Sequence, residues 1–116
     1  MTYQSSDVCG VYSIQGWNPG ADDLSYEGEL ELQEDGELIV ARWVIGPDIM
    51  FGSGFFEGDK LVLAFNFIDP YQGAVTGVVM YDVRASGQLE GRWSVFGGQL
   101  RGRESCTLLQ KTGPLH

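Results

Sequence analysis

The chain has 116 residues and a formal net charge of −9, because 16 acidic side chains outweigh 7 basic ones. This length predicts one small domain, residues 1–116, and a hydrophobic content of 43% suffices for a folded core. The negative charge repels phosphate backbones and anionic lipid, which excludes nucleic acid and membrane surfaces as expected partners. No apolar run reaches the roughly 18 residues that a membrane-spanning helix needs.

Apolar residues recur at every second position through most of the chain, which is typical of strands with one buried face. The clearest alternation covers residues 24–32, where leucine and tyrosine alternate with serine and glutamate. In chain order, the predicted strands are 9–17, 24–34, 37–45, 49–56, 60–68, 74–84, 88–96 and 103–110. Glycine-containing turns at 34–37, 57–60 and 85–88 favour antiparallel neighbours.

These elements predict an all-β fold, a small antiparallel up-and-down barrel of about eight strands. Calycins and avidin share this architecture, but such an analogy does not transfer function. We expect short disordered tails near 1–8 and 111–116. The first residues contain neither a basic segment nor an apolar one of the signal-peptide type, which predicts a cytoplasmic protein.

The alternation assigns one set of side chains to the barrel axis. This inward set is Tyr12, Ile14, Tyr26, Leu30, Leu32, Ile39, Ala41, Trp43, Leu61, Leu63, Phe65, Phe67, Val79, Tyr81, Val83, Leu89, Trp93, Val95, Cys106 and Leu108. Glycines share the same faces, and several glycines on one face are typical of a strongly coiled, closed barrel.

Several residues predicted to face outward are also apolar: Val40, Val44, Val62, Ala64, Val78 and Met80. Apolar patches on a protein surface often mark interfaces, so we expect a homo-oligomer that uses this wall. Two alternatives are a second layer that covers the wall and a register shifted by one residue.

The cysteine and histidine content argues against several chemistries. Cys9 and Cys106 are too few for a paired-thiolate zinc site, and they are predicted to lie on opposite faces as free thiols. The only histidine, His116, is the last residue, which argues against a Ser-His-Asp or Cys-His nucleophile. We therefore expect a protein without enzymatic activity.

A pattern of glycine, tyrosine and tryptophan extends over residues 10–110. Its parts are Gly10-x-Tyr12-x-Ile14-x-Gly16, Asn18-Pro19-Gly20, Tyr26-x-Gly28, Trp43, Gly52-x-Gly54, Leu61-x-Leu63, Tyr81-x-Val83, Gly87-x-Leu89-x-Gly91-x-Trp93 and Gly102-x-Glu104. The pattern resembles a family of small bacterial β-barrel proteins that often carry a fibronectin-binding or uncharacterised label. The resemblance implies a barrel and no established activity. We do not carry the fibronectin label over, because the chain contains no evident adhesive motif.

The predicted ligand-binding residues are inward aromatic side chains together with one carboxylate: Tyr12, Tyr26, Trp43, Phe65, Tyr81, Trp93 and Glu104. A barrel of this size is wide enough either to be filled by side chains or to hold one small ligand, and the sequence leaves both outcomes open. No cofactor motif is present.

Glu104 is in phase with Leu108 and Cys106, which places it inside the barrel. A buried carboxylate of this kind can anchor a polar ligand or act as an acid or base. Alternatively, Glu104 lies at the rim and pairs with Arg101 or Arg103.

The longest loops, 17–23 and 68–73, carry Asp22, Asp23 and Asp69, whose spacing matches no calcium-binding loop. We predict no metal site. The leading functional hypothesis is a self-associating barrel that binds a small apolar or aromatic ligand, or a protein partner. The alternatives are an acid–base enzyme that uses Glu104 and a tyrosine, and a purely structural or interaction protein.

Overall fold

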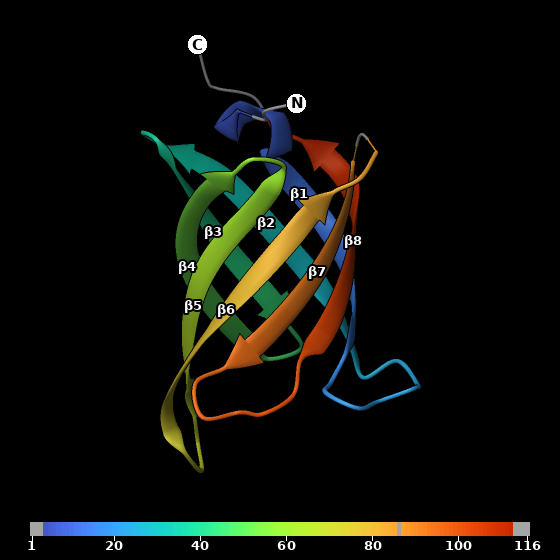
Figure 1. Ribbon diagram of the computed structural model, residues 1–116, viewed down its shortest axis with the longest axis vertical. Helices are drawn as coiled ribbons and strands as arrows, with labels where there is room; N and C mark the ends of the chain where they lie inside the picture. Colours follow the sequence, from blue (N-terminus) through green and yellow to red (C-terminus); the bar gives the residue numbers. More distant parts are fainter. Residues whose placement is uncertain (1–3, 86, 113–116) are drawn as a thin grey trace.

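The computed structural model describes residues 4–85 and 87–112. Within these residues, eight antiparallel strands close into a barrel in chain order, and β1 pairs with β8 (Figure 1). The strands are β1 (Gly10–Trp17), β2 (Tyr26–Asp35), β3 (Leu38–Ile45), β4 (Asp48–Glu57), β5 (Lys60–Asp69), β6 (Gly73–Val83), β7 (Gln88–Val95) and β8 (Gly102–Lys111). This confirms the predicted fold class.

The period-two alternation fixes which side chains enter the lumen. On β3, Ile39, Ala41 and Trp43 are buried, whereas Leu38, Val40 and Arg42 between them are exposed. The whole predicted inward set belongs to the buried core or packs against it. A register shift of one residue would place all of these side chains in water, so the burial of apolar surface selects this register.

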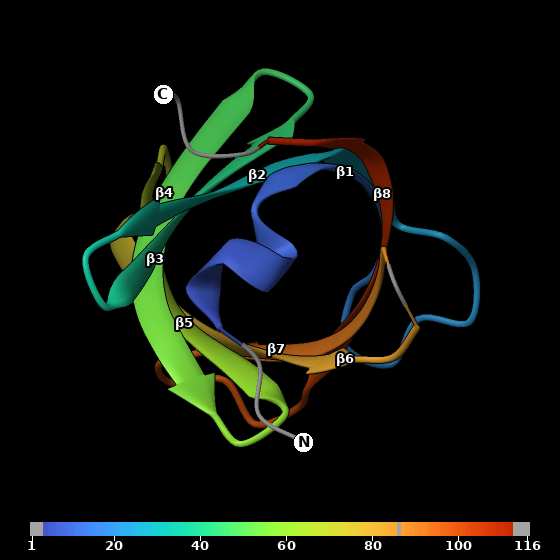
Figure 2. The ribbon, with the colours of Figure 1, turned by 90° about the horizontal axis from the view of Figure 1, so that it is seen from above.

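The two ends of the barrel are built differently (Figure 1). Three tight hairpins and the 3-10 helix η1 (Ser5–Val8) lie at one end, which we call the closed end. The four remaining connections, 18–25, 46–47, 70–72 and 96–101, lie at the opposite end, which we call the loop end. Seen along the barrel, η1 lies across the closed end (Figure 2).

The expectation of a disordered tail is wrong for residues 5–8. These residues form η1, and Val8 is only 2% exposed. The Tyr12 hydroxyl donates a hydrogen bond of 2.7 Å to the Val8 carbonyl oxygen. Burial of Val8 outweighs the cost of ordering the segment, because the closed end of the lumen would otherwise be open to water. At the other tail, β8 extends to Lys111, and residues 1–3 and 113–116 lie outside the described residues.

The outward apolar residues lie on the outer faces of β3, β4, β5 and β6, with Arg42, Ser53 and Asn66 between them. We call this patch the outer wall; it comprises Val40, Val44, Ile49, Phe51, Phe55, Val62, Ala64, Val78 and Met80. Three members of β4 that the sequence analysis did not assign are the most exposed, with Ile49 at 51%, Phe51 at 56% and Phe55 at 52%. Val44, Val62 and Met80 are half-buried by their neighbours.

Both cysteines are buried free thiols. Cys106 faces the lumen as expected. Cys9 precedes β1, and its thiol donates a hydrogen bond of 3.2 Å to the Ser5 carbonyl oxygen under η1.

Tyr12→Phe tests the closed end. The substitution removes the hydroxyl and leaves the Val8 carbonyl without its side-chain donor, so we expect it to lower the free energy of unfolding by about 1–2 kcal/mol. Chemical denaturation measures this loss. Tyr71→Phe is the matched control, because Tyr71 is 96% exposed and should leave stability unchanged. Equal stability of the two variants would contradict the assignment.

Candidate functional site

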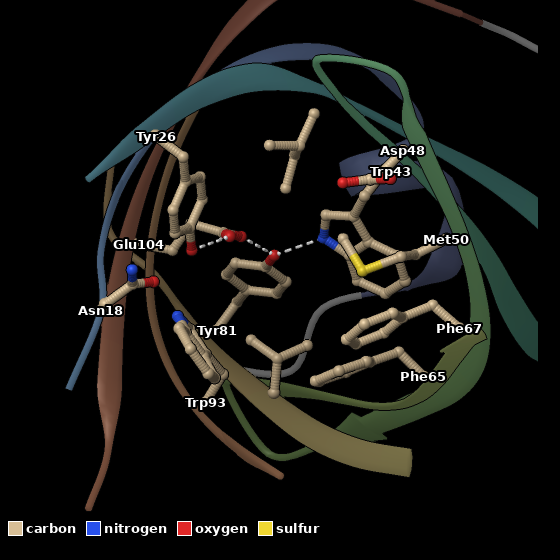
Figure 3. A pocket seen from close by; sticks show the side chains of 12 residues that line it. Asn18, Tyr26, Trp43, Asp48, Met50, Phe65, Phe67, Tyr81, Trp93 and Glu104 are labelled. Atoms are coloured by element: carbon tan, nitrogen blue, oxygen red, sulfur yellow. Dashed lines mark hydrogen bonds between the residues drawn. The ribbon is translucent and has the colours of Figure 1, made fainter. Parts of the chain in front are cut away.

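A cavity of about 270 Å³ occupies the lumen toward the loop end. It is lined by Asn18, Tyr26, Trp43, Ile45, Asp48, Met50, Phe65, Phe67, Val79, Tyr81, Trp93 and Glu104 (Figure 3). Most of these side chains are aromatic or aliphatic. Binding sites for small molecules typically combine such apolar walls with a few polar groups.

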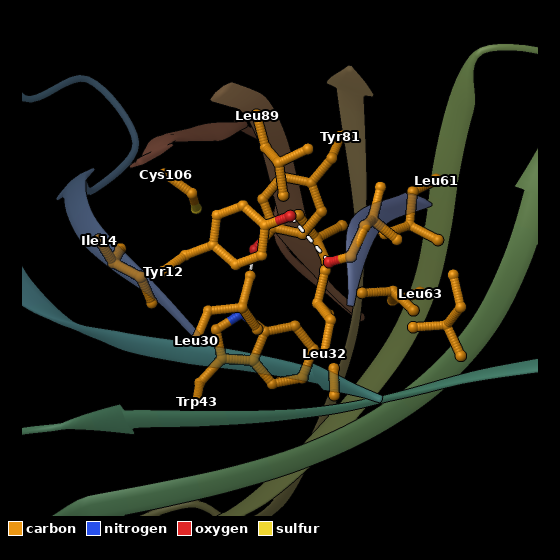
Figure 4. Close-up of a cluster of buried hydrophobic side chains, with 14 of the residues drawn as sticks. Tyr12, Ile14, Leu30, Leu32, Trp43, Leu61, Leu63, Tyr81, Leu89 and Cys106 are labelled. Carbon is orange, nitrogen blue, oxygen red and sulfur yellow. Dashed lines mark hydrogen bonds between the residues drawn. The ribbon is translucent and has the colours of Figure 1, made fainter. Parts of the chain in front are cut away.

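The remainder of the lumen, toward the closed end, is filled by packed side chains (Figure 4). Leu32, Leu61, Leu63 and Leu89 are at most 1% exposed. The lumen is therefore filled in one half and hollow in the other, which decides between the two outcomes that the sequence left open.

Four of the lining rings lie against glycines. Each glycine is the direct cross-strand partner of its ring: Gly16 of Tyr26, Gly77 of Phe65, Gly91 of Tyr81 and Gly102 of Trp93. A Cβ atom on any of these glycines would lie between 1.8 and 2.6 Å from the ring, closer than real contacts allow. The glycines let the rings lie along the barrel wall and leave space in the lumen.

Glu104 lies inside the barrel on β8 and is 5% exposed. The Tyr26 hydroxyl donates to its Oε1 at 2.7 Å, and the Tyr81 hydroxyl donates to its Oε2. The Tyr81 oxygen itself accepts a hydrogen bond of 3.0 Å from Trp43 Nε1. The Tyr81 hydroxyl thus accepts from the tryptophan N–H and donates to the carboxyl group. The chain of donors therefore runs from Trp43 through Tyr81 to Glu104 (Figure 3).

Burial in the lumen perturbs the acidity of these groups. Desolvation raises the pKa of Glu104, although the hydrogen bonds from Tyr81 and Tyr26 favour the charged form and partly offset it. Burial, reinforced by the neighbouring Glu104 carboxyl, also raises the pKa of Tyr26 and of Tyr81 well above the usual tyrosine range. Both tyrosines therefore remain protonated donors at neutral pH.

Trp93 supplies a further polar group. Its Nε1 atom is buried and has no hydrogen-bond partner among residues 4–85 and 87–112. The indole N–H lies near the Tyr26 hydroxyl but outside hydrogen-bond geometry. It nevertheless favours the ionised form of Tyr26 and so opposes the rise in the Tyr26 pKa. A buried donor without an acceptor costs free energy. A ligand that carries an acceptor would remove that cost.

The structure brings six of the seven predicted site residues to the cavity: Tyr26, Trp43, Phe65, Tyr81, Trp93 and Glu104. The placement of Tyr12 in this site is not supported, because its hydroxyl bonds to Val8 at the closed end. The alternative that Glu104 pairs with arginine at the rim is wrong. Arg103 points outward instead, and its guanidinium lies 4.8 Å from the centre of the Trp17 ring.

Sequence reasoning did not assign Met50, Ile45, Asp48 and Asn18 to the site. Residues 51–55 of β4 read Phe-Gly-Ser-Gly-Phe, so the glycines mark one face, and Met50 and Phe56 share that face. The glycine–proline turn at 46–47 pairs Met50 directly with Trp43, and this pairing was the available signal.

The acidic loops do not converge into a site. The Asp69 carboxylate accepts the backbone N–H groups of Tyr71 at 2.7 Å and Gln72 at 3.0 Å, which is a structural turn. Across residues 4–85 and 87–112, no group of three or more histidine, cysteine or acidic side chains could hold a metal ion. None of the helices in the described residues is long and apolar enough to cross a membrane. His116 lies outside the described residues.

No protein-family model matches the chain, and no curated protein matches it either. The resemblance to small bacterial β-barrel proteins therefore stays a prediction.

The pH dependence of stability tests the environment of Glu104. Because the pKa of Glu104 is raised in the folded state, its stabilising contribution is fully present below the unfolded pKa of 4.5 and is lost as pH rises through the folded value. Glu104→Gln removes this dependence. The free energy of unfolding of the variant minus that of the wild type should therefore increase with pH above 4.5.

Urea denaturation at a series of pH values measures this difference. Glu27→Gln removes an exposed glutamate from the outer face of β2 and controls for the loss of one carboxylate. If this difference in the free energy of unfolding decreases with pH, or increases no more than it does for the control, Glu104 is not desolvated.

Proposed function

We propose that this protein is a non-enzymatic barrel that binds a small apolar or aromatic ligand in its lumen. The observation that carries the proposal is the cavity of about 270 Å³ that remains at the loop end of an otherwise packed barrel. A cavity lined by apolar side chains that is not filled by the protein loses packing contacts, and a ligand of matching shape restores them.

The size of the cavity sets the size of the ligand. An apolar cavity of about 150 Å³ engineered into another protein accommodates benzene. A volume of 270 Å³ therefore suits a single aromatic ring with a short substituent. Larger polycyclic ligands would need the connections at the loop end to move.

The lining also supports an aromatic ligand. The Trp43 and Phe65 rings pack edge to face, with centroids 5.8 Å apart, so one wall of the cavity is rigid. Met50 lies beside them and is the kind of flexible side chain that adapts to different ligand shapes (Figure 3).

Ile45→Trp tests ligand binding. Ile45 is a half-buried lining residue, and a tryptophan there should fill part of the cavity. With toluene as the probe, we expect binding to the wild type and an affinity lower by at least about tenfold in the variant, through loss of buried apolar area. Ligand-observed NMR and thermal shift measure both affinities.

Leu109→Trp is the control, because Leu109 is 60% exposed on β8 outside the cavity. This control should bind toluene as the wild type does. A wild-type protein that binds neither toluene nor other single-ring compounds would contradict the proposal.

Self-association through the outer wall is a second proposed property. It is supported by the exposure of Ile49, Phe51 and Phe55. Ile49 pairs with Val44 on β3, and Phe55 pairs with Val62 on β5. Contact between two such walls would bury large apolar side chains, and salt screens the repulsion between the net negative charges of the two copies.

The double variant Phe51→Ser/Phe55→Ser tests this surface. Loss of two large apolar side chains should weaken self-association by on the order of tenfold or more. Sedimentation velocity over a range of concentrations measures it, with Leu109→Ser as the control on β8. A wild-type protein that stays monomeric at high concentration would contradict self-association.

Acid–base catalysis remains the alternative in which Glu104 exchanges a proton with a bound molecule. The observation in its favour is that this desolvated carboxyl lines the cavity. Tyr26 and Tyr81 each donate a hydrogen bond to one carboxyl oxygen. These bonds fix the carboxyl group in place, which favours ligand binding over proton exchange.

A further inference from the structure

The two buried carboxylates of the described chain have different surroundings. Asp82, on the outer face of β6, is 8% exposed and pairs with Lys60 at 2.6 Å and Arg92 at 3.1 Å. Glu104 is equally buried, but no ion pair reaches it within residues 4–85 and 87–112. A buried carboxylate without a cation is costly in a folded protein.

The hydrogen bonds around Glu104 nevertheless favour its ionised form. The Tyr81 hydroxyl donates to one carboxyl oxygen while its own oxygen accepts a hydrogen bond from Trp43 Nε1. The Tyr26 hydroxyl donates to the other carboxyl oxygen. Hydrogen-bond donors placed in advance around a carboxylate prepare it to pair with a cation. Oε1 of Glu104 keeps a further lone pair for that purpose, whereas Oε2 also accepts a long contact of 3.8 Å from Cys106 Sγ.

The other lining groups also favour positive charge. None of the described residues that line the cavity is basic. Aromatic rings surround the carboxylate, and their π faces attract cations. Asp48 lies on the lining at the loop end, and the whole chain carries a net charge of −9, which attracts cations toward the opening.

Apart from Asp48, which lies on the side of Trp43 and Met50, the polar and apolar groups are segregated within the cavity (Figure 3). Glu104, Tyr26 and the Trp93 nitrogen lie together on one side, whereas Met50, Phe65 and Phe67 lie on the other (Figure 3). A ligand that matches this arrangement has one polar end and one apolar end.

From this arrangement we infer that the cavity binds a small arylalkyl ammonium ion, with its charged nitrogen paired to Glu104 and its ring between Met50, Phe65 and Phe67. This inference rests on the proposed ligand-binding function and names its ligand class. An acceptor atom near the ammonium group, such as a hydroxyl oxygen, would accept the free N–H of Trp93.

Three probes of similar size test the charge preference: 2-phenylethylamine, neutral 2-phenylethanol and anionic phenylacetate. Isothermal titration calorimetry at neutral pH and low salt measures their affinities for the wild-type protein. A buried ion pair supported by hydrogen bonds predicts that the amine binds more tightly than the alcohol by on the order of tenfold, and that the anion binds most weakly.

Variants then locate the charge that is responsible. Glu104→Gln should reduce the preference for the amine over the alcohol to less than about threefold, because it removes the charge and keeps the shape. Glu27→Gln, which removes an exposed carboxylate from the outer face of β2, should keep the preference. Trp93→Phe should weaken the alcohol, whose oxygen would lose its donor, more than it weakens toluene.

The outcomes separate the inference from the function on which it rests. Binding of the alcohol or the anion at least as tightly as the amine overturns the ammonium inference and leaves small-ligand binding intact. A preference for the amine that survives Glu104→Gln also overturns the inference, because the attraction then comes from the net charge. Binding by none of the three probes or toluene contradicts the proposed function itself. The comparison of probes on the wild type gives a result even if Glu104→Gln does not fold.

Discussion

The close contact between glycines and aromatic rings is the constraint on which the rest of this structure depends. Inside a small closed barrel, side chains from opposite walls compete for the same volume. Tyr26, Phe65, Tyr81 and Trp93 avoid that competition by lying over Gly16, Gly77, Gly91 and Gly102 on the neighbouring strands. A methyl group on any of these glycines would push its ring into the lumen. The cavity therefore exists because residues without side chains lie directly opposite the largest ones.

The same geometry explains why a carboxylate is tolerated so far from water. The ring of Tyr26 on Gly16 and the ring of Tyr81 on Gly91 direct both hydroxyl groups at Glu104. Two hydrogen bonds reduce the cost of desolvation without removing it, so the pKa of Glu104 remains raised. Asp82 shows the other solution: Lys60 and the neighbouring arginines lower its pKa, which favours its ionised form despite its burial. The lumen thus holds a buried carboxyl group to which the described residues supply no cationic partner.

Apolar residues on the inner face of the barrel stabilise the fold, whereas those on the outer face remain in contact with water. Inside, the apolar residues at the closed end are packed and covered by η1, so their burial stabilises the fold. Outside, Phe51 and Phe55 lie on the face of β4 opposite Gly52 and Gly54, so this strand exposes two of its three phenylalanines. In the isolated chain these two side chains stay largely in contact with water. Only contact with another surface would gain the free energy of burying them.

The sequence by itself determined the elements, the antiparallel order and the inward face of most strands. Period-two alternation and short glycine turns are local signals, and they placed Trp43, Tyr81 and Glu104 inside the barrel before any coordinates. The tertiary structure decided what those residues do. Tyr12 and Tyr26 belong to the same inward pattern, yet one bonds to Val8 at the closed end and the other to Glu104 in the cavity. Their roles differ because position along the barrel axis depends on strand stagger and on which end η1 covers, and no local pattern encodes either. The hollow half of the lumen has the same origin, since empty volume is set by how all eight walls pack together.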